Sequence, residues 1–207
     1  MNSILILYPS LFQSYGKFCR KLSKIIQNIE LARLICIEDS NGFIADAAQL
    51  FNMEVMKIED LRNNLDLITH VIIFDDGEEF AEEMNIIKAK DLPVRYIKIL
   101  ITRVINIHAE TEFKLERSSD KYEYIGRGSK WGNPYSILAV EDLEDGEDPR
   151  EVVINNFKYD FANNKLMTVK KEEVFTLAGK RLGCFCKPLA CHGDILAEYL
   201  NSWDDGK

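Results

Sequence analysis

Two short segments in the second half of the sequence concentrate residue types that bind anions or act as nucleophiles. The first, residues 126–134, contains three glycines within seven residues, a composition that turns backbone N–H groups toward one point. Arg127 and Lys130 add positive charge, and Trp131 and Tyr135 offer flat faces on which a base can stack. The segment is not a Walker loop, because no Gly-Lys-Ser/Thr opens a helix. It predicts either an anion site or a tight turn with a buried tryptophan.

The second segment, residues 184–194, holds three of the five cysteines and one of the three histidines. Cys191 and His192 precede a predicted helix, whose N-terminal dipole lowers the pKa of a thiol and stabilises anions. Asp194, in the first turn, would act as an acid or base or fix the histidine tautomer. Two other interpretations remain. Reduced cysteines fill a core with Asp194 as helix cap, or a zinc ion is held by Cys184, Cys186, Cys191 and His192.

These patterns assign candidate roles to single residues. The catalytic candidates are Cys191, His192 and Asp194. The ligand-binding candidates are Gly126, Arg127, Gly128, Ser129, Lys130, Trp131, Asn133 and Arg181. No cofactor is expected, since the spacing departs from that of zinc knuckles and adjacent Cys and His ligands strain one centre. Five cations lie in or beside the two segments, namely Arg127, Lys130, Lys180, Arg181 and Lys187, so we expect one shared pocket that takes an anionic ligand.

The elements that position these segments differ between the two halves of the chain. Residues 3–8, 34–37, 71–74 and 94–100 form compact apolar runs typical of buried strands, and helical patterns at 43–51 and 78–88 separate them. A longer helical pattern at 11–29 begins with Ser10 and Gln13 placed as a capping box. This alternation predicts a Rossmann-like parallel sheet over residues 1–100, with ligands beyond the carboxyl ends of its strands.

Residues 101–207 predict a smaller α+β domain. Strand patterns at 104–107 and 122–125 flank a charged hairpin segment, and a further strand is expected at 180–186. Asp148 and Pro149 are placed as the cap and first residue of a helix, and residues 193–203 predict a closing helix. The acidic stretch at 141–148 is interpreted as a solvated surface loop.

Three stretches carry a family resemblance: residues 124–134, 179–186 and 191–194. They resemble a family of bacterial and phage domains of unknown function over about residues 101–202. This resemblance implies that the two segments form one signature and share a site. Residues 40–46 and 75–79 are similar to the nucleotide-binding Rossmann superfamily that includes DprA and the cytokinin-activating phosphoribohydrolases. That superfamily holds phosphates with Gly-rich turns, whereas this sequence keeps only Gly42 and Gly77 with acids around them.

Composition limits the functional classes. The net charge is -8 and the pI is about 5.0, so the surface as a whole repels nucleic acid and any anion site is local. No secretory signal or membrane span is visible, which predicts a cytoplasmic protein without membrane contact. Five unevenly placed cysteines do not form a secreted disulfide framework. The expected partner is an anionic small molecule, a nucleotide or a nucleic-acid base, and the oligomeric state is left open.

The leading functional hypothesis is an enzyme that processes a nucleotide, nucleotide sugar or nucleic-acid base by glycosyl-bond cleavage or transfer, as an N-glycosidase or glycosyltransferase. Arg127 and Lys130 would hold phosphate, and Trp131 would stack the base. Asp194 would act at the reacting centre. Two alternatives are a non-catalytic sensor or sponge for a nucleotide-derived ligand, and a phage-type factor that binds a host protein.

Overall fold

The computed structural model describes residues 2–27, 29, 32–113, 117–140, 143 and 146–206. The chain forms two compact units. The N-terminal unit comprises Met1–Leu100 and Ser202–Lys207, and the C-terminal unit comprises Ile101–Asn201. Within the described ranges, no helix is long and apolar enough to cross a membrane.

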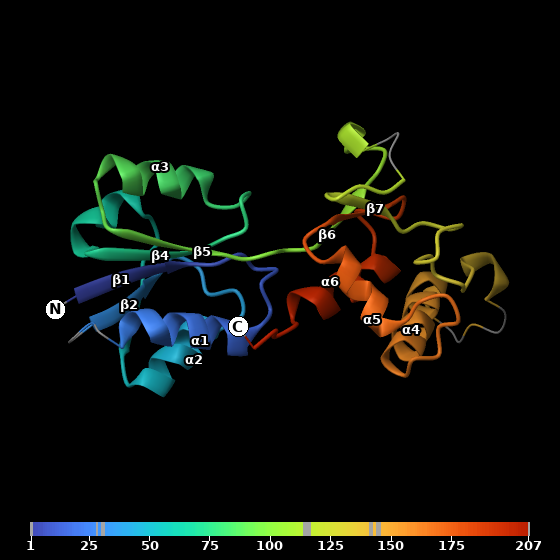
Figure 1. Cartoon of the computed structure of the whole chain (residues 1–207), viewed down its shortest axis with the longest axis horizontal. Coiled ribbons are helices and arrows are strands. Elements are labelled where there is room, and N and C mark those ends of the chain that lie inside the picture. The colour runs from blue at the N-terminus through green and yellow to red at the C-terminus, as the bar shows by residue number, and fades with distance from the viewer. Residues whose placement is uncertain are drawn as a thin grey trace. The chain divides into compact units, whose positions relative to one another are not determined.

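A five-stranded parallel sheet forms the centre of the N-terminal unit (Figure 1). Its strands, in the spatial order β3-β2-β1-β4-β5, are β1 (Asn2–Leu7), β2 (Ala32–Cys36), β3 (Glu54–Lys57), β4 (His70–Asp75) and β5 (Val94–Lys98). Helices α1 (Tyr15–Ile26) and α2 (Phe43–Phe51) cover one face, and α3 (Ala81–Ala89) covers the other. The strand order reverses between β1 and β4, which places the topological switch point at their carboxyl ends. The predicted Rossmann-like α/β fold is confirmed.

Burial on both faces of the sheet explains the continuous apolar runs of its central strands. Residues 4–7 of β1 and 71–74 of β4 are at most 4% exposed. On the face covered by α1 and α2, the Phe18 and Phe74 rings stack with their centroids 4.8 Å apart. The Phe43 ring of α2 lies 5.5 Å from that of Phe18. Aromatic packing therefore holds these two helices to the sheet.

Two helices begin later than predicted, because polar turns precede them. The capping box at Ser10 does not form, since the Phe12 N–H donates to the Pro9 carbonyl and closes a turn. Ser14 is the residue that precedes α1. Before α3, the carboxylate of Asp76 accepts hydrogen bonds from the Glu78 and Glu79 N–H groups, so the helix starts only at Ala81.

The C-terminal unit contains a three-stranded parallel sheet in which β8 (Arg181–Cys184) lies between β6 (Arg103–Asn106) and β7 (Tyr122–Tyr124). The two outer strands pair with β8 and not with each other. The charged segment before β7 folds back on it through an antiparallel bridge between Ser118 and Glu123. Of the predicted acidic loop at 141–148, residues 141, 142, 144 and 145 lie outside the described residues.

Three helices complete the C-terminal unit (Figure 1): α4 (Pro149–Ala162), α5 (Lys171–Val174) and α6 (His192–Asn201). The predicted start of α4 is confirmed, since the Asp148 side chain accepts a hydrogen bond from the Arg150 N–H and Pro149 is the first helical residue. Phe157 of α4, Leu182 of β8 and Leu196 of α6 are fully buried in one hydrophobic core.

The carboxylate of Glu123, in β7, connects three segments of the C-terminal unit. It accepts hydrogen bonds from Ser118 Oγ at 2.6 Å, Trp131 Nε1 at 3.1 Å and Lys180 Nζ at 3.3 Å. Burial opposes ionisation of this carboxyl, but the three donors outweigh burial and hold the pKa of Glu123 below its usual value. Ionised Glu123 thus fastens the loop after β7 to the residue before β8.

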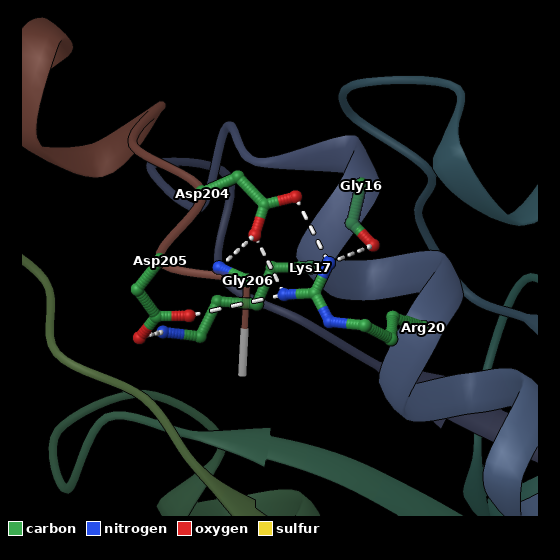
Figure 2. Close-up of polar contacts among 6 residues, drawn as sticks. All are labelled: Gly16, Lys17, Arg20, Asp204, Asp205 and Gly206. Carbon is green, nitrogen blue, oxygen red and sulfur yellow. Dashed lines mark hydrogen bonds and ion pairs between the residues drawn. The ribbon is translucent and has the colours of Figure 1, made fainter.

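The C-terminal tail binds back onto α1 in the N-terminal unit. Figure 2 shows Arg20 donating two hydrogen bonds to the Asp204 carboxylate, at 3.0 and 2.6 Å, while Lys17 donates to Asp205 at 3.0 Å. The Gly206 N–H also donates to Asp204, and this paired carboxyl has its pKa lowered to about 2, chiefly by Arg20. Paired charges therefore hold the tail on the helix.

We expect Arg20→Ala to release the tail without unfolding the protein. Exposed ion pairs contribute little to global stability, so the melting temperature should stay within about 2 °C. The Gly206 amide should exchange with deuterium much faster, because its acceptor is no longer held in place. Arg62→Ala, which breaks the exposed ion pair with Glu82 elsewhere in the same unit, is the matched control. Equal exchange at Gly206 in both variants would contradict tail anchoring by Arg20.

We expect Glu123→Gln to change the acid limb of the stability profile. Because the folded-state pKa is depressed, ionised Glu123 contributes stability above its ordinary pKa of 4.5. That contribution is lost as the pH falls through the lower folded-state value. The variant should be less stable than the wild type at pH 7 and should lose less stability on acidification, as measured by urea unfolding at several pH values. The exposed Glu172→Gln should follow the wild-type profile, and an identical profile for Glu123→Gln would refute the prediction.

Candidate functional site

Residues from both signature segments line one cavity of about 170 Å³ in the C-terminal unit. Residues 126–134 contribute Gly126, Arg127 and Asn133, and residues 184–194 contribute Cys184, Phe185, Cys186, Ala190, Cys191 and His192. The other lining residues are Tyr135, Ile137, Arg150, Val153 and Ile154. The candidates Arg127, Asn133, Cys191 and His192 therefore lie together.

Parallel pairing in the small sheet explains why the two segments meet. The carboxyl ends of β7 and β8 lie at the same edge, and the pairing continues beyond β7 because the Ile125 N–H donates to the Gly183 carbonyl at 2.9 Å. His192, at the start of α6, then donates from Nε2 to the Ile125 carbonyl at 3.0 Å. Gly193 permits this approach, because a Cβ there would lie 2.4 Å from Ile125 Cδ1.

The glycines at residues 126–134 allow the tight backbone turns and the internal hydrogen bonds of this loop. Gly128 has φ +88°, a conformation that favours glycine, and a Cβ on Gly132 would lie 2.9 Å from the Gly126 carbonyl oxygen. The Ser129 N–H and Oγ both donate to the Gly126 carbonyl, and the Gly132 N–H donates to the Ser129 carbonyl. These N–H groups are therefore used within the loop and do not form the predicted cradle. Gly128 and Ser129 do not line the cavity.

Trp131 is a core residue and not a stacking platform. It is 2% exposed, and Lys130 Nζ lies 4.3 Å from the centre of its ring. Its indole N–H donates to Glu123. The expectation that Trp131 stacks a base is corrected by this burial. Two other flat side chains line the cavity: Tyr135, which is half-buried against the core, and Phe185, which is 51% exposed and lies 4.9 Å from the His108 ring.

The predicted cations divide into paired and unpaired groups. Four of them face carboxylates: Lys130 with Glu173 at 3.7 Å, Lys180 with Glu123 at 3.3 Å, Arg181 with Glu110 at 3.7 Å, and Lys187 with Asp194. None of these four lines the cavity. Arg127 and Arg150 do line it, and among the described residues no carboxylate lies within ion-pairing distance of either guanidinium. The expected ligand-binding roles of Lys130 and Arg181 are thus not supported by position.

Arg150 lines the cavity but is not among the residues predicted from the sequence, although its place at the start of a helix was a signal. It is the second residue of α4, directly after Pro149. A cation in the first turn opposes the helix dipole, so its presence there calls for a partner elsewhere. In the structure its guanidinium donates to the Ala190 carbonyl at 3.3 Å, beside the cysteine segment.

The thiols and the imidazole converge at the cavity. Cys184 Sγ lies 3.4 Å from Cys186 Sγ, and Cys191 Sγ lies 3.6 Å from His192 Nδ1. One ligand atom each from Cys184, Cys191 and His192 lies within 4.8 Å of the others, and all three residues are buried. Because His192 Nε2 faces a carbonyl oxygen, that nitrogen carries the proton and Nδ1 is free to accept or to ligate.

Hydrogen bonds separate the acidities of these groups. The Cys191 thiol donates to Cys184 and, outweighing burial, lowers the pKa of Cys184 to about 5. The same interaction raises the pKa of Cys191, and burial raises that of Cys186. Burial also lowers the pKa of His192, which keeps the imidazole neutral at pH 7. The cluster therefore places Cys184, the most acidic of these thiols, next to an imidazole that favours its neutral form.

Asp194 has a structural position. Its carboxylate accepts a hydrogen bond from the Cys191 N–H at 2.9 Å and pairs with Lys187, and the residue does not line the cavity. The predicted helix-cap interpretation of Asp194 matches these contacts, whereas a role at a reacting centre does not. Asp194 shapes the turn that carries Cys191 into α6.

The carboxyl edge of the N-terminal sheet is occupied by its own acids. The Asp39 carboxylate accepts hydrogen bonds from the Ile44 and Ala45 N–H groups at the start of α2. Asp75 accepts one from the Gly77 N–H. These are the positions at which helix starts and glycine turns bind phosphate, so carboxylates fill them in this chain.

Comparisons with known proteins divide the chain in the same two parts. Residues 1–105 match the family model of the minimal SLOG domain, and residues 107–202 match a domain of unknown function, DUF4326. An uncharacterised 12.4 kDa protein from the nrdA-td intergenic region of Enterobacteria phage T4 is 41% identical over 78 residues. That match covers 37% of this chain and 65% of the relative's length. No solved structure shows a significant match.

These matches agree with the two resemblances at the level of family. The C-terminal match is to a domain of unknown function and contains both signature segments, and the uncharacterised relative is a phage protein. The N-terminal match is to a DprA-like domain and covers half of the chain. The protein belongs to the minimal SLOG family, within the nucleotide-related SLOG superfamily.

Proposed function

We propose that this protein binds a nucleotide-derived anion in the cavity of its C-terminal unit. The observation that carries the proposal is the pair of guanidinium groups, Arg127 and Arg150, that line this cavity without carboxylate partners among the described residues. Guanidinium groups bind phosphate through paired, charge-assisted hydrogen bonds. Two such groups at one cavity favour a phosphate over a neutral ligand.

The size and walls of the cavity suit one part of a nucleotide. Its volume of about 170 Å³ is below the roughly 300–1,000 Å³ typical of pockets for whole drug-sized ligands. It can therefore enclose a phosphate or a sugar phosphate, with the remainder of the ligand outside. Tyr135 and the exposed Phe185 provide aromatic surface for that remainder.

Family membership supports the ligand class. The SLOG superfamily is nucleotide-related, and SLOG-type domains often bind nucleotide-derived ligands. At the carboxyl edge of the SLOG sheet, however, the carboxylates of Asp39 and Asp75 already accept the backbone N–H groups that a phosphate would use. We therefore assign the ligand to the C-terminal cavity.

The geometry favours binding over glycosyl-bond chemistry. Glycosyl transfer uses carboxylates beside the scissile bond, and no Asp or Glu is among the described residues that line the cavity. Asp194 is engaged with Cys191 and Lys187. The non-catalytic sensor or sponge is accordingly our first choice among the functional hypotheses.

We expect Arg127→Ala and Arg150→Ala each to weaken binding about 10- to 100-fold, the equivalent of losing one charge-assisted hydrogen bond of about 1.5–3 kcal/mol. Calorimetric titration with AMP, ADP-ribose and ribose 5-phosphate, and with adenosine as the uncharged comparison, measures this. Phosphorylated probes should bind more tightly than adenosine.

Arg62→Ala is the matched control and should bind like the wild type, since its ion pair with Glu82 lies in the N-terminal unit. Mass spectrometry after the titration should recover each probe unchanged. Turnover that disappears in Arg127→Ala would favour the enzyme hypothesis instead. If no phosphorylated probe binds, or if both variants bind as the wild type does, the proposal is wrong.

A further inference from the structure

The thiol and imidazole cluster of the C-terminal unit has the composition of a metal site. Cys184, Cys191 and His192 are each at most 6% exposed, and their ligand atoms lie within 4.8 Å of one another. Cys186 adds a third sulfur beside Cys184. We infer that these four residues bind one zinc ion in a tetrahedral Cys₃His site.

The spacings agree with the size of a tetrahedral zinc centre. Zinc lies about 2.3 Å from sulfur and about 2.0–2.1 Å from nitrogen, which places neighbouring ligand atoms roughly 3.5–3.8 Å apart. The sulfurs of Cys184 and Cys186 lie 3.4 Å apart, and Cys191 Sγ lies 3.6 Å from His192 Nδ1. Cys184, Cys191 and His192 already form a group of this size, whereas Cys186 lies outside that group and would reach the same ion by rotation of its side chain.

The surroundings of the ligands are those expected around zinc. His192 donates its Nε2–H to the Ile125 carbonyl, which leaves Nδ1 as the ligating nitrogen and fixes the plane of the ring. The Gly193 N–H donates to Cys191 Sγ at 3.4 Å, a contact that favours the thiolate form. Both contacts come from the backbone, and the Asp194 carboxylate also holds the turn at Cys191 by accepting its N–H.

The backbone between the ligands is also fixed. Cys184 ends β8, and Cys191 immediately precedes α6. Between them, the Leu189 N–H donates to the Cys186 carbonyl and the Asn106 side chain donates to the Lys187 carbonyl. This turn returns the chain to the end of β8, so that Cys191 and His192 lie beside Cys184 although they are adjacent in sequence.

The chemical type of the ligand atoms indicates which metal this site prefers. Three sulfurs with one imidazole favour zinc over magnesium or calcium, which prefer oxygen ligands. The competing interpretation is a redox pair. It is motivated by the free thiols of Cys184 and Cys186, whose sulfurs lie 3.4 Å apart, and the measurements below distinguish it from a zinc site.

The test measures metal in the full-length chain, produced with added zinc and purified with a reductant and without chelators. We expect about one zinc per chain by elemental analysis. Cys184→Ser and Cys191→Ser should each reduce this below about a tenth of an equivalent. Cys19→Ser, which changes a free cysteine in the N-terminal unit, is the matched control and should retain full zinc.

A second measurement uses the wild-type chain and so does not depend on variants that fail to fold. Replacement of the zinc by Co²⁺ should produce sulfur-to-cobalt charge-transfer absorption and the intense d–d bands of a tetrahedral site. Zinc below a tenth of an equivalent in the zinc-supplied wild type, together with no tetrahedral cobalt spectrum, would overturn the inference. A disulfide among these cysteines in metal-free protein would identify the redox pair instead. Neither measurement requires a nucleotide, so the result is independent of the proposed function.

Discussion

Parallel pairing of β8 between β6 and β7 is the constraint on which the rest of the C-terminal unit depends. Parallel neighbours end at the same edge, so the loop after β7 and the cysteine segment after β8 emerge side by side. The hydrogen bond from His192 to the Ile125 carbonyl then ties the start of α6 to the start of the loop. One backbone arrangement thus assembles segments that are about 60 residues apart in sequence.

Charge compensation determines which cations remain available to a ligand. Lys180 pairs with Glu123, and Lys187 with Asp194, so their charges are neutralised within the fold. Arg127 and Arg150 line the cavity with no such partner among the residues described. A desolvated or confined like-charge pair costs free energy unless an anion compensates it. The available charge is therefore smaller than the number of basic residues suggests, and it is concentrated at one cavity.

The fold was largely predictable from the sequence, whereas the site was predictable only in part. Buried runs such as residues 71–74 predict strands because parallel sheets are covered on both faces, and the Asp148 cap marked α4. Side-chain roles depended on tertiary pairing that no local pattern contains. Trp131 became a core residue because Glu123 accepts its N–H, and Asp194 became a cap because its carboxylate meets the Cys191 N–H.

The two units differ in whether their own carboxylates occupy the positions at which an anion could bind. In the N-terminal unit, Asp39 and Asp75 accept the N–H groups that would bind a phosphate, and Asp204 accepts the guanidinium of Arg20. The protein's own carboxylates thus already supply the negative charge that a ligand would bring. In the C-terminal unit the guanidinium groups at the cavity lack such carboxylates. A bound anion would displace an internal carboxylate in the first unit, whereas in the second it would compete only with the uncharged oxygens of Ser136 and Ala190 that Arg127 and Arg150 contact. The lower cost of binding is the physical reason to place the ligand in the C-terminal cavity.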